Sequence, residues 1–296
     1  MDSNGGKELI KSVTIGSSQA ALTIDGMKGL EIPCPKVNIQ RKIVSILSAY
    51  DNLIENNNRR IAILEEMAQR LYREWFVHFR FPGHESVNMV ESELGLIPEG
   101  WKVGYLSDIS ENYRKSVKKS DREKYNHYLP IDCLPRKSLM LNEVKPIEEA
   151  ESSLMEFCEN DIIMGAMRVY FHKIICAPFN GLTRSTCFVI RPKKDTYHSY
   201  LLMTIFQEGS IEYANTISVG ATMPYVIWDT FSNMKIVIPH ENIVKKYHDI
   251  ISPIISEING VYFKNTNLRK TRDLLLPPLI SGDIDVSDLP IPTEED

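Results

Sequence analysis

The sequence predicts a mixed α/β protein in which a globular domain lies between two long helices. Apolar residues recur in alternating steps of three and four over residues 37–79 and again over 241–276, which is the spacing of a coiled-coil or bundle helix. The stretch between them, residues 98–239, differs because short β-rich runs alternate there with Gly, Pro and Asn, a pattern typical of strands joined by turns.

The first helical pattern contains neither Gly nor Pro. Its apolar stripe consists of Ile43, Leu47, Tyr50, Ile54, Ile61, Leu64, Ala68, Leu71 and Trp75. The opposite face carries Arg41, Lys42, Glu55, Arg59, Arg60, Glu65, Glu66, Gln69 and Arg70. Asn57 falls on the stripe, where a buried Asn can fix register and partner. We expect Phe81-Pro82-Gly83 to end this helix.

The second pattern begins near Glu241, and its stripe consists of Ile243, Tyr247, Ile250, Ile251, Ile254, Ile258, Val261, Leu268 and Leu275. Pro253 lies inside it and is a candidate kink. We expect Pro277-Pro278 to stop the helix, ahead of a polar, acidic tail.

In the middle stretch, strands are expected at residues 162–164, 174–177, 187–190 and 235–238, and one helix at 200–213.

A shift of 204 residues superposes the two ends of the chain. It brings Gly16 onto Gly220, Ile43 onto Tyr247 and Leu64 onto Leu268. With two residues of slack, Leu30–Pro33 precedes the first helix as Ile236–Pro239 precedes the second. The first 35 residues are therefore expected to be the end of a domain whose full copy is the middle stretch.

Composition excludes several classes of protein. The chain has 34 Lys and Arg against 39 Asp and Glu, so a basic total does not point to nucleic acid, although DNA binding depends on where cations cluster. No apolar run approaches the ~20 residues that cross a bilayer, and residues 1–8 lack the apolar core of a secretion signal. The expected location is the cytoplasm. The five cysteines form no Cys-x-x-Cys pair, which favours reduced thiols over a zinc site.

Enzyme motifs are weak. The sequence has no phosphate-binding glycine loop, Gly-x-Ser-x-Gly or His-Glu-x-x-His, and Pro277-Pro278 lacks the preceding polar residue of an adenine methyltransferase motif. Asp132, Glu143 and Lys145 have the order of a metal-dependent nuclease, a pattern that arises easily by accident. That nuclease remains one alternative.

Two segments of the middle stretch, residues 112–126 and 161–194, are locally basic. Arg and Lys beside Tyr, Ser and Thr suit phosphate contacts and base-edge hydrogen bonds, although a solvated surface gives the same pattern. Arg168, after a strand and a Gly turn, suits bidentate contact with guanine. The candidate DNA-binding residues are Arg114, Lys115, Lys118, Lys119, Arg122, Lys124, Arg168, Tyr170, Lys173, Arg184, Ser185, Thr186 and Thr222.

The end of the first helix carries an aromatic cluster of Trp75, Phe76 and Phe79. Packing inside the chain and contact with a partner protein both explain it.

Longer stretches are similar to a known family. Residues 47–61 (LSAYDNLIENNNRRI), 64–72 (LEEMAQRLY) and 75–83 (WFVHFRFPG) resemble the central conserved region of type I restriction–modification specificity subunits. Residues 272–282 (RDLLLPPLISG) resemble their distal conserved region, and 97–101 (IPEGW) the entry to a target-recognition domain.

The resemblance implies a DNA-reading subunit without catalytic or metal-binding residues. It implies a remnant of a first recognition domain (1–35), a central helix (36–81), a recognition domain (97–239), a distal helix (240–281) and a tail (282–296), with the helices in an antiparallel coiled coil. Implied partners are double-stranded DNA, modification subunits that bind S-adenosylmethionine, and a restriction subunit that uses ATP and Mg²⁺.

Trp75, Phe76 and Phe79 are then candidate contacts to the modification subunit. A homodimer would supply a second recognition domain, and it would cover Ile39, Ile43 and Ile46, which are expected to be exposed. A scaffold that competes for the modification subunit without binding DNA is the other alternative.

Overall fold

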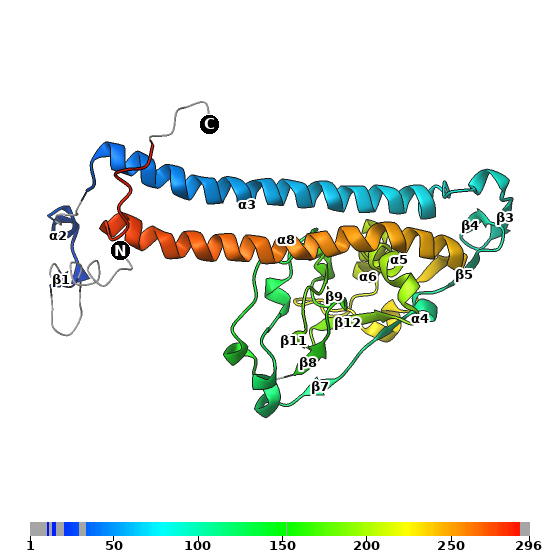
Figure 1. Cartoon of the computed structure of the whole chain (residues 1–296). Helices are drawn as coiled ribbons and strands as arrows, with labels where there is room; N and C mark the ends of the chain where they lie inside the picture. The colour runs from blue at the N-terminus through cyan, green and yellow to red at the C-terminus, as the bar shows by residue number, and fades with distance from the viewer. Residues whose placement is uncertain (1–10, 12–13, 16–20, 30–33, 152, 291–296) are drawn as a thin grey trace. The chain divides into compact units, whose positions relative to one another are not determined.

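The computed structural model describes residues 11, 14–15, 21–29, 34–151 and 153–290. The chain forms two compact units, one of residues 1–56 and 265–296 and one of residues 57–264. Two long helices, α3 (Val37–Tyr72) and α8 (Glu241–Ser281), contribute a part to each unit (Figure 1). Over the described ranges, no helix is both long and apolar enough to span a membrane.

In the unit of residues 57–264, α3 and α8 run antiparallel. The Tyr247 hydroxyl donates to the Ala68 carbonyl at 3.3 Å, and Arg60 pairs with Glu257 at 3.2 Å, so rising residue numbers on one helix meet falling numbers on the other. The predicted stripes are largely buried, as at Ile61 and Ile258. This arrangement follows from the three-and-four spacing of the apolar residues.

Two assignments of a residue to a helix face are wrong in this unit, one on the apolar stripe and one on the polar face. Ile250 is exposed, while the buried position of that turn belongs to Ile251. Glu65, expected on the polar face, is buried because its carboxylate accepts hydrogen bonds from the Leu139 amide at 2.6 Å and the Ser138 hydroxyl at 2.7 Å. Burial raises the pKa of Glu65. This carboxylate therefore anchors a loop of the central domain to α3.

The helix ends also differ from the sequence prediction. Helix α3 gives way to a π-helical turn, Arg73–Val77, and Phe79 then adopts φ 57°, so the helical path ends before Phe81-Pro82-Gly83. Helix α8 continues past Pro277-Pro278 and ends at Ser281, where Gly282 adopts φ 85°. A left-handed glycine is a common helix terminator, and here it sets the end of the helix.

The central domain is built on a four-stranded antiparallel sheet of order β10-β9-β12-β6, of which Figure 1 labels β9 and β12. These strands are β6 (Ser110–Asn112), β9 (Ile162–Gly165), β10 (Ile174–Cys176) and β12 (Cys187–Pro192). A three-stranded sheet of order β11-β8-β7 consists of β7 (Ser116–Val117), β8 (Leu154–Phe157) and β11 (Gly181–Arg184). Two-stranded pairs join β5 (Lys102–Tyr105) to β13 (Lys235–Ile238), and β3 (Met89–Ser92) to β4 (Gly95–Pro98).

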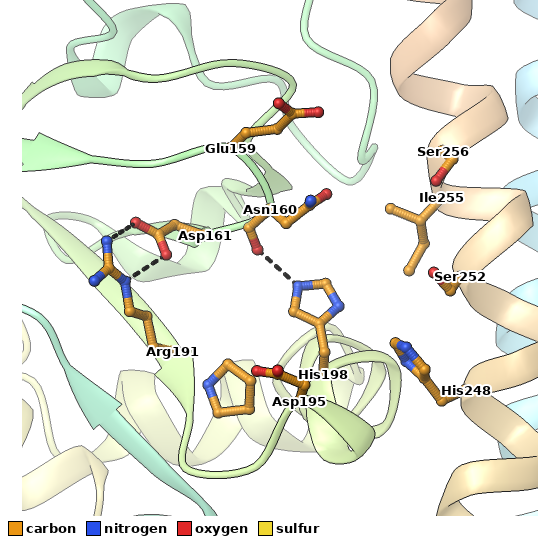
Figure 2. A pocket seen from close by; sticks show the side chains of 11 residues that line it. Glu159, Asn160, Asp161, Arg191, Asp195, His198, His248, Ser252, Ile255 and Ser256 are labelled. Atoms are coloured by element: carbon orange, nitrogen blue, oxygen red, sulfur yellow. Dashed lines mark hydrogen bonds and ion pairs between the residues drawn. The ribbon is translucent and has the colours of Figure 1, made fainter.

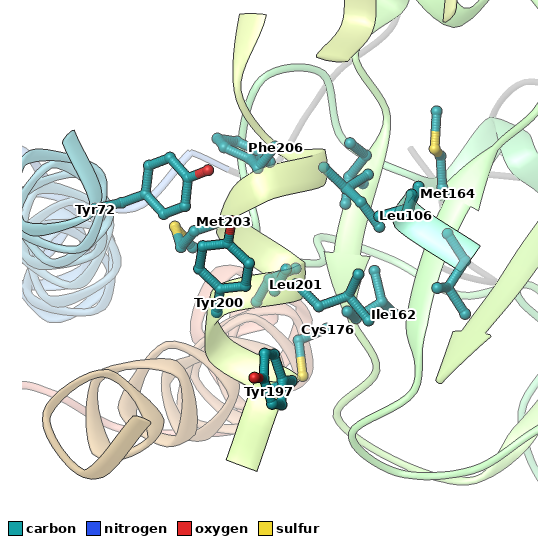
Figure 3. Close-up of a cluster of buried hydrophobic side chains, with 14 of the residues drawn as sticks. Tyr72, Leu106, Ile162, Met164, Cys176, Tyr197, Tyr200, Leu201, Met203 and Phe206 are labelled. Atoms are coloured by element: carbon teal, nitrogen blue, oxygen red, sulfur yellow. The ribbon is translucent and has the colours of Figure 1, made fainter. Parts of the chain in front are cut away.

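Both faces of the four-stranded sheet are buried. Ile162 and Met164 belong to the cluster that includes the helices, while Ile163 between them belongs to a second cluster. Alternate residues of a strand face opposite sides, so a continuous apolar run is needed here. Figure 3 shows Tyr200 and Leu201 of helix α5 between Tyr72 and this sheet.

The helix predicted over residues 200–213 is two helices, α5 (His198–Ile205) and α6 (Glu208–Thr216). Gln207 between them is extended, and the one Gly of the predicted helix, Gly209, lies two residues further on, inside α6. Two single-turn helices, α4 (Leu106–Ile109) and α7 (Trp228–Phe231), complete the domain.

In the other unit, the ends of α3 and α8 pack on each other and on residues 282–290. Ile43 is buried with Leu279 and Val286, and Ile39 and Ile46 pack against this cluster. The expectation that these three isoleucines are exposed is therefore wrong. Lys42, expected on the polar face, is also buried, since its ammonium donates to the Ser287 carbonyl at 2.6 Å.

The unit also holds the strand pair β1 (Thr14–Ile15) and β2 (Ala21–Leu22) and the short helix α2 (Ile24–Lys28). Gly16 and Leu30–Pro33, on which the predicted repeat partly depends, lie outside the described residues.

Candidate nucleic-acid interface

Arg168 stands at the start of a tight loop after strand β9. It adopts φ 47°, and His172 four residues later adopts φ 53°, so two left-handed residues bracket the 3-10 turn Val169–Phe171. Non-glycine residues persist in this conformation only where their surroundings enforce it. The Arg168 amide donates to the Pro224 carbonyl at 2.7 Å, and the Lys137 amide donates to the His172 carbonyl at 2.9 Å. Both ends of the loop are therefore held in place.

A second loop lies beside the first. Val219 and Tyr225 exchange two backbone hydrogen bonds of 2.9 Å, which closes a five-residue turn from Gly220 to Pro224. Gly220 adopts φ 97°, a conformation that favours glycine. Met167 and Tyr225 form an antiparallel bridge, so the turn, with Thr222 exposed at its tip, is attached to the Arg168 loop.

The turn between β11 and β12 completes this surface. The Ala166 amide donates to the Thr186 carbonyl at 2.9 Å, and the Ser185 amide donates to the Ser153 carbonyl at 2.9 Å. Arg184 and Ser185 are exposed. We refer to residues 166–172, 184–186 and 219–225 as the loop surface. It brings together six predicted DNA-binding residues from three separate segments of the sequence: Arg168, Tyr170, Arg184, Ser185, Thr186 and Thr222.

The basic segment of residues 112–126 approaches the same edge of the domain. In the three-stranded sheet, Val117 pairs with Leu154, and Leu154 pairs with Arg184. Strand β8 therefore lies between the end of β7, which Lys118 follows, and the end of β11. Lys118 is exposed.

Several predicted cations are engaged inside the domain. Arg122 donates to the carbonyls of Glu148 and Ala150 at 3.0 and 3.1 Å, and Lys173 donates to the Ile131 carbonyl at 2.7 Å. Lys115, Lys119 and Lys124 pair with Glu156, Glu151 and Asp121, respectively. In contrast, Arg114, Lys118, Arg168 and Arg184 are exposed and form no ion pair with another described residue. The cations open to an anionic ligand are thus fewer than the charge count suggests.

One cation beside the loop surface was missed. The Arg136 guanidinium lies over the Phe171 ring at 3.8 Å from its centroid, and Arg136 is exposed. It lies outside both basic segments and next to a Pro, so local charge density does not single it out. Its neighbour Lys137 pairs with Glu208 at 2.8 Å, and Glu208 also contacts His172 Nδ1 at 3.0 Å. Burial lowers the pKa of His172, so the imidazole that Glu208 contacts is neutral at neutral pH.

A carboxylate network supports the other basic segment. Glu156 accepts hydrogen bonds from the Tyr125 hydroxyl at 2.5 Å and from Lys115. Burial alone raises the pKa of Glu156, but these hydrogen bonds outweigh it and lower the pKa below its usual value. The hydrogen bond to this carboxylate raises the pKa of Tyr125 to about 12. Lys115 is therefore part of a structural network.

A cavity of about 370 Å³ lies between the central domain and helix α8 (Figure 2). Its lining includes Glu159, Asp161 and Asp195. Asp161 forms a bidentate pair with Arg191, whereas Glu159 and Asp195 form no ion pair with another described residue. His198 Nε2 contacts the Asn160 carbonyl at 2.7 Å, and burial lowers the pKa of His198. The excess of carboxylates does not suit a polyanion, so this cavity is not the nucleic-acid interface.

The nuclease alternative gains no support. Lys145 pairs with Glu149 at 3.3 Å, and its amide bonds to the Tyr128 carbonyl. In the part of the chain that the structure describes, no three or more His, Cys, Asp or Glu side chains, Asp132 and Glu143 included, gather where a metal ion would fit.

The aromatic cluster at the end of α3 packs inside the chain. Trp75 and Phe76 are each only 6% exposed, and the Phe76 ring lies 4.7 Å from Tyr200 and 4.8 Å from Tyr247, centroid to centroid. Phe79 is partly buried against Trp101 at 5.6 Å. The prediction that these three residues contact a partner is wrong for Trp75 and Phe76, which have no surface to offer.

Comparisons with known proteins agree on one family. Residues 6–66 and 98–262 match the model of the type I restriction modification DNA specificity domain. The chain is 28% identical to the MjaIX specificity subunit of Methanocaldococcus jannaschii, over 95% of this chain and 67% of that protein. It is 22% identical to the HindI specificity subunit of Haemophilus influenzae, over 89% and 71%.

The fold agrees as well. The crystal structure of a type I specificity subunit from M. genitalium superposes with a TM-score of 0.53 at 16% identity, covering 92% of this chain and 69% of that one. The predicted fold class, a mixed α/β domain with two long helices in contact, is thereby confirmed.

Proposed function

The chain belongs to the type I restriction–modification DNA specificity family, and we propose that it reads its DNA target with the loop surface. Such a subunit is the non-catalytic, DNA-recognising part of the restriction–modification complex, and the cofactors belong to the modification and restriction subunits. The nuclease and scaffold alternatives are set aside on this ground.

One observation carries the proposal. Arg168 is exposed, forms no ion pair with another described residue, and is fixed at its backbone by the Pro224 carbonyl. An arginine held in this way keeps its guanidinium fork free, and that fork matches the O6 and N7 acceptors of guanine. Arg184 on the same surface and Lys118 at the neighbouring end of β7 supply positive charge for phosphates.

Two substitutions separate base reading from phosphate binding. Arg168→Ala is expected to weaken discrimination at one base pair by about 1–3 kcal/mol. Lys118→Ala is expected to weaken binding to all sequences and to reduce the slope of log affinity against log salt by about 0.9, the value for a single phosphate that is no longer neutralised. Fluorescence anisotropy with target and scrambled duplexes, at several salt concentrations, measures both effects.

Lys235→Ala is the matched control, because Lys235 is an exposed cation on β13 and its partner is Glu93. It should leave affinity and salt slope unchanged. If Arg168→Ala and Lys118→Ala also leave them unchanged, the loop surface is not the DNA interface.

Modification and restriction subunits are the proposed protein partners. The outward face of α3 supports such docking, because Ile63 and Met67, one turn apart, are more than half exposed. Exposed apolar side chains at neighbouring helical positions are typical of a surface that another protein covers.

A homodimer is the second proposal on assembly. The sequence given carries one complete recognition domain, and two copies related by a two-fold axis present two. The proposal no longer rests on Ile39, Ile43 and Ile46, because they pack within the unit. The same unit has four other apolar side chains that are each more than half exposed: Val37, Val44, Leu274 and Ile280. Two-fold pairing is the commonest symmetry of soluble homo-oligomers.

Light scattering tests both assembly proposals in one experiment. The wild-type chain at micromolar concentration is expected to have twice the mass of one 33.9 kDa chain, and Leu274→Glu is expected to reduce that mass by half. When the modification subunit is added, the mass of the wild type should increase further. Met67→Glu should keep the mass of the dimer but show no increase with the modification subunit. A wild-type mass of one chain contradicts the homodimer, and an unaffected complex with Met67→Glu contradicts this docking face.

A further inference from the structure

The loop surface and the two residues that follow it, 226–227, have an apolar part that neither packing nor charge explains. Val219, Tyr225 and Ile227 are 40%, 46% and 45% exposed, and Met223 at the tip of the turn is 56% exposed. Val226, between two of them, is buried. In an extended segment the outward positions are normally polar, since alternate residues face opposite sides. Here inward and outward positions are both apolar.

Backbone pairing places three of these side chains, those of Val219, Tyr225 and Ile227, on the same side. Val219 and Met167 each form an antiparallel bridge with Tyr225, and residues directly opposite each other in such pairs have Cβ atoms about 4.5–5.5 Å apart on the same side. Ile227 lies two residues after Tyr225 and therefore faces the same way. We refer to these three residues, together with the exposed Met223 at the tip of the same turn, as the apolar row.

The charge around the row selects the class of ligand. Arg168 is hydrogen-bonded through its backbone to the same turn, and Arg136 lies over Phe171 of the same loop. Both cations are exposed, which suits an anionic ligand. A polyanion that also offers apolar groups to an apolar row is double-stranded DNA in its major groove, where the C5 methyl of thymine is the apolar group at the base edges.

We propose that the apolar row contacts the C5 methyl group of thymine and makes T·A pairs part of the half-site that this domain reads. The proposal rests on the proposed function, because it assumes that the loop surface faces DNA. Burying one methyl group is worth about 0.8 kcal/mol, which corresponds to about a fourfold change in affinity.

The experiment removes the methyl group from the DNA. The methylated motif is first found by sequencing DNA from a host that expresses the chain with its modification subunit. Duplexes of this motif are then made with each thymine in turn replaced by deoxyuridine, which lacks the methyl group and keeps base pairing. Binding is measured with the complex of both subunits. For the wild type, deoxyuridine at one or two positions is expected to weaken binding about fourfold.

Variants then connect the methyl group to the apolar row. Val219→Thr with Met223→Gln keeps side-chain shape and length and removes apolar contact, so the fourfold penalty of deoxyuridine is expected to disappear. Leu96→Gln on β4, an equally exposed apolar position at 53%, is the matched control and should keep the penalty. Thermal melting that matches the wild type shows that each variant is folded.

The outcomes separate this inference from the function on which it rests. If the complex binds its motif and no thymine shows a penalty, or the penalty persists in the double variant, the inference is wrong and the proposed function stands. If the double variant loses only affinity for the modification subunit, the row is a protein-binding surface. If the wild-type complex binds no duplex, both proposals fail.

Discussion

Replacing Phe76 by alanine should cost the unit of residues 57–264 about 3–5 kcal/mol of unfolding free energy, the range for deleting a buried aromatic ring. Phe76 joins three parts of the unit, because its ring contacts Tyr72 at the end of α3, Tyr200 on α5 and Tyr247 on α8. Its three tyrosine neighbours also contact one another, so they can move only in part to fill the space. The loss therefore includes a cavity term as well as the transfer of the ring.

Urea unfolding monitored by tryptophan fluorescence measures this effect, because all three tryptophans, Trp75, Trp101 and Trp228, belong to this unit. Val77→Ala is the matched control: Val77 is the next residue and half exposed, so its loss should change stability by about 0.5 kcal/mol or less. Equal effects of the two substitutions would contradict the packing role of Phe76.

Replacing Asp161 by alanine is expected to destabilise the central domain by about 3 kcal/mol. The carboxylate is 6% exposed and accepts hydrogen bonds from Arg191 Nε at 2.6 Å, Arg191 Nη2 at 2.7 Å and the Cys158 amide at 2.7 Å. Removing one partner of a buried pair costs about 3–5 kcal/mol. We expect the lower end because the Arg191 side chain is 26% exposed, so water solvates part of the uncompensated charge.

The control is Glu241→Ala, which breaks the exposed Lys194–Glu241 pair and should cost at most about 1 kcal/mol. Denaturant unfolding of both variants gives the comparison. A small and equal loss would mean that the Asp161–Arg191 pair contributes no more than a surface ion pair.

The long helices were predictable because their pattern repeats over many turns. An error at one position, such as Ile250, leaves the stripe recognisable, and the strands at residues 162–164 and 187–190 were equally clear because each is a short apolar run. Glu65 shows the limit of this reasoning. A charged residue off the stripe is normally exposed, and only the fold brings the Leu139 amide to it.

The candidate site was less predictable, because its geometry depends on hydrogen bonds between distant segments. The sequence identified Arg168 and Thr222 separately, but not the contact of Arg168 with Pro224 that brings their loops together. Nor does a charge count distinguish Arg122, whose guanidinium donates to two backbone carbonyls, from Arg168, which forms no ion pair with another residue that the structure describes. The partner of a side chain decides its role, and sequence order does not give the partner.

The closed turn from Gly220 to Pro224 separates the residues that hold the loop from those at its tip. Val219, Gly220, Pro224 and Tyr225 provide its backbone hydrogen bonds and its left-handed residue, whereas the tip residues 221–223 are exposed. A change of side chain at the tip therefore removes none of the hydrogen bonds that hold the loop. Under the proposed function, new sequence preferences can arise by substitution at these three positions while the stability of the domain is retained, so the evolution of specificity in this protein is not bound to the evolution of its core.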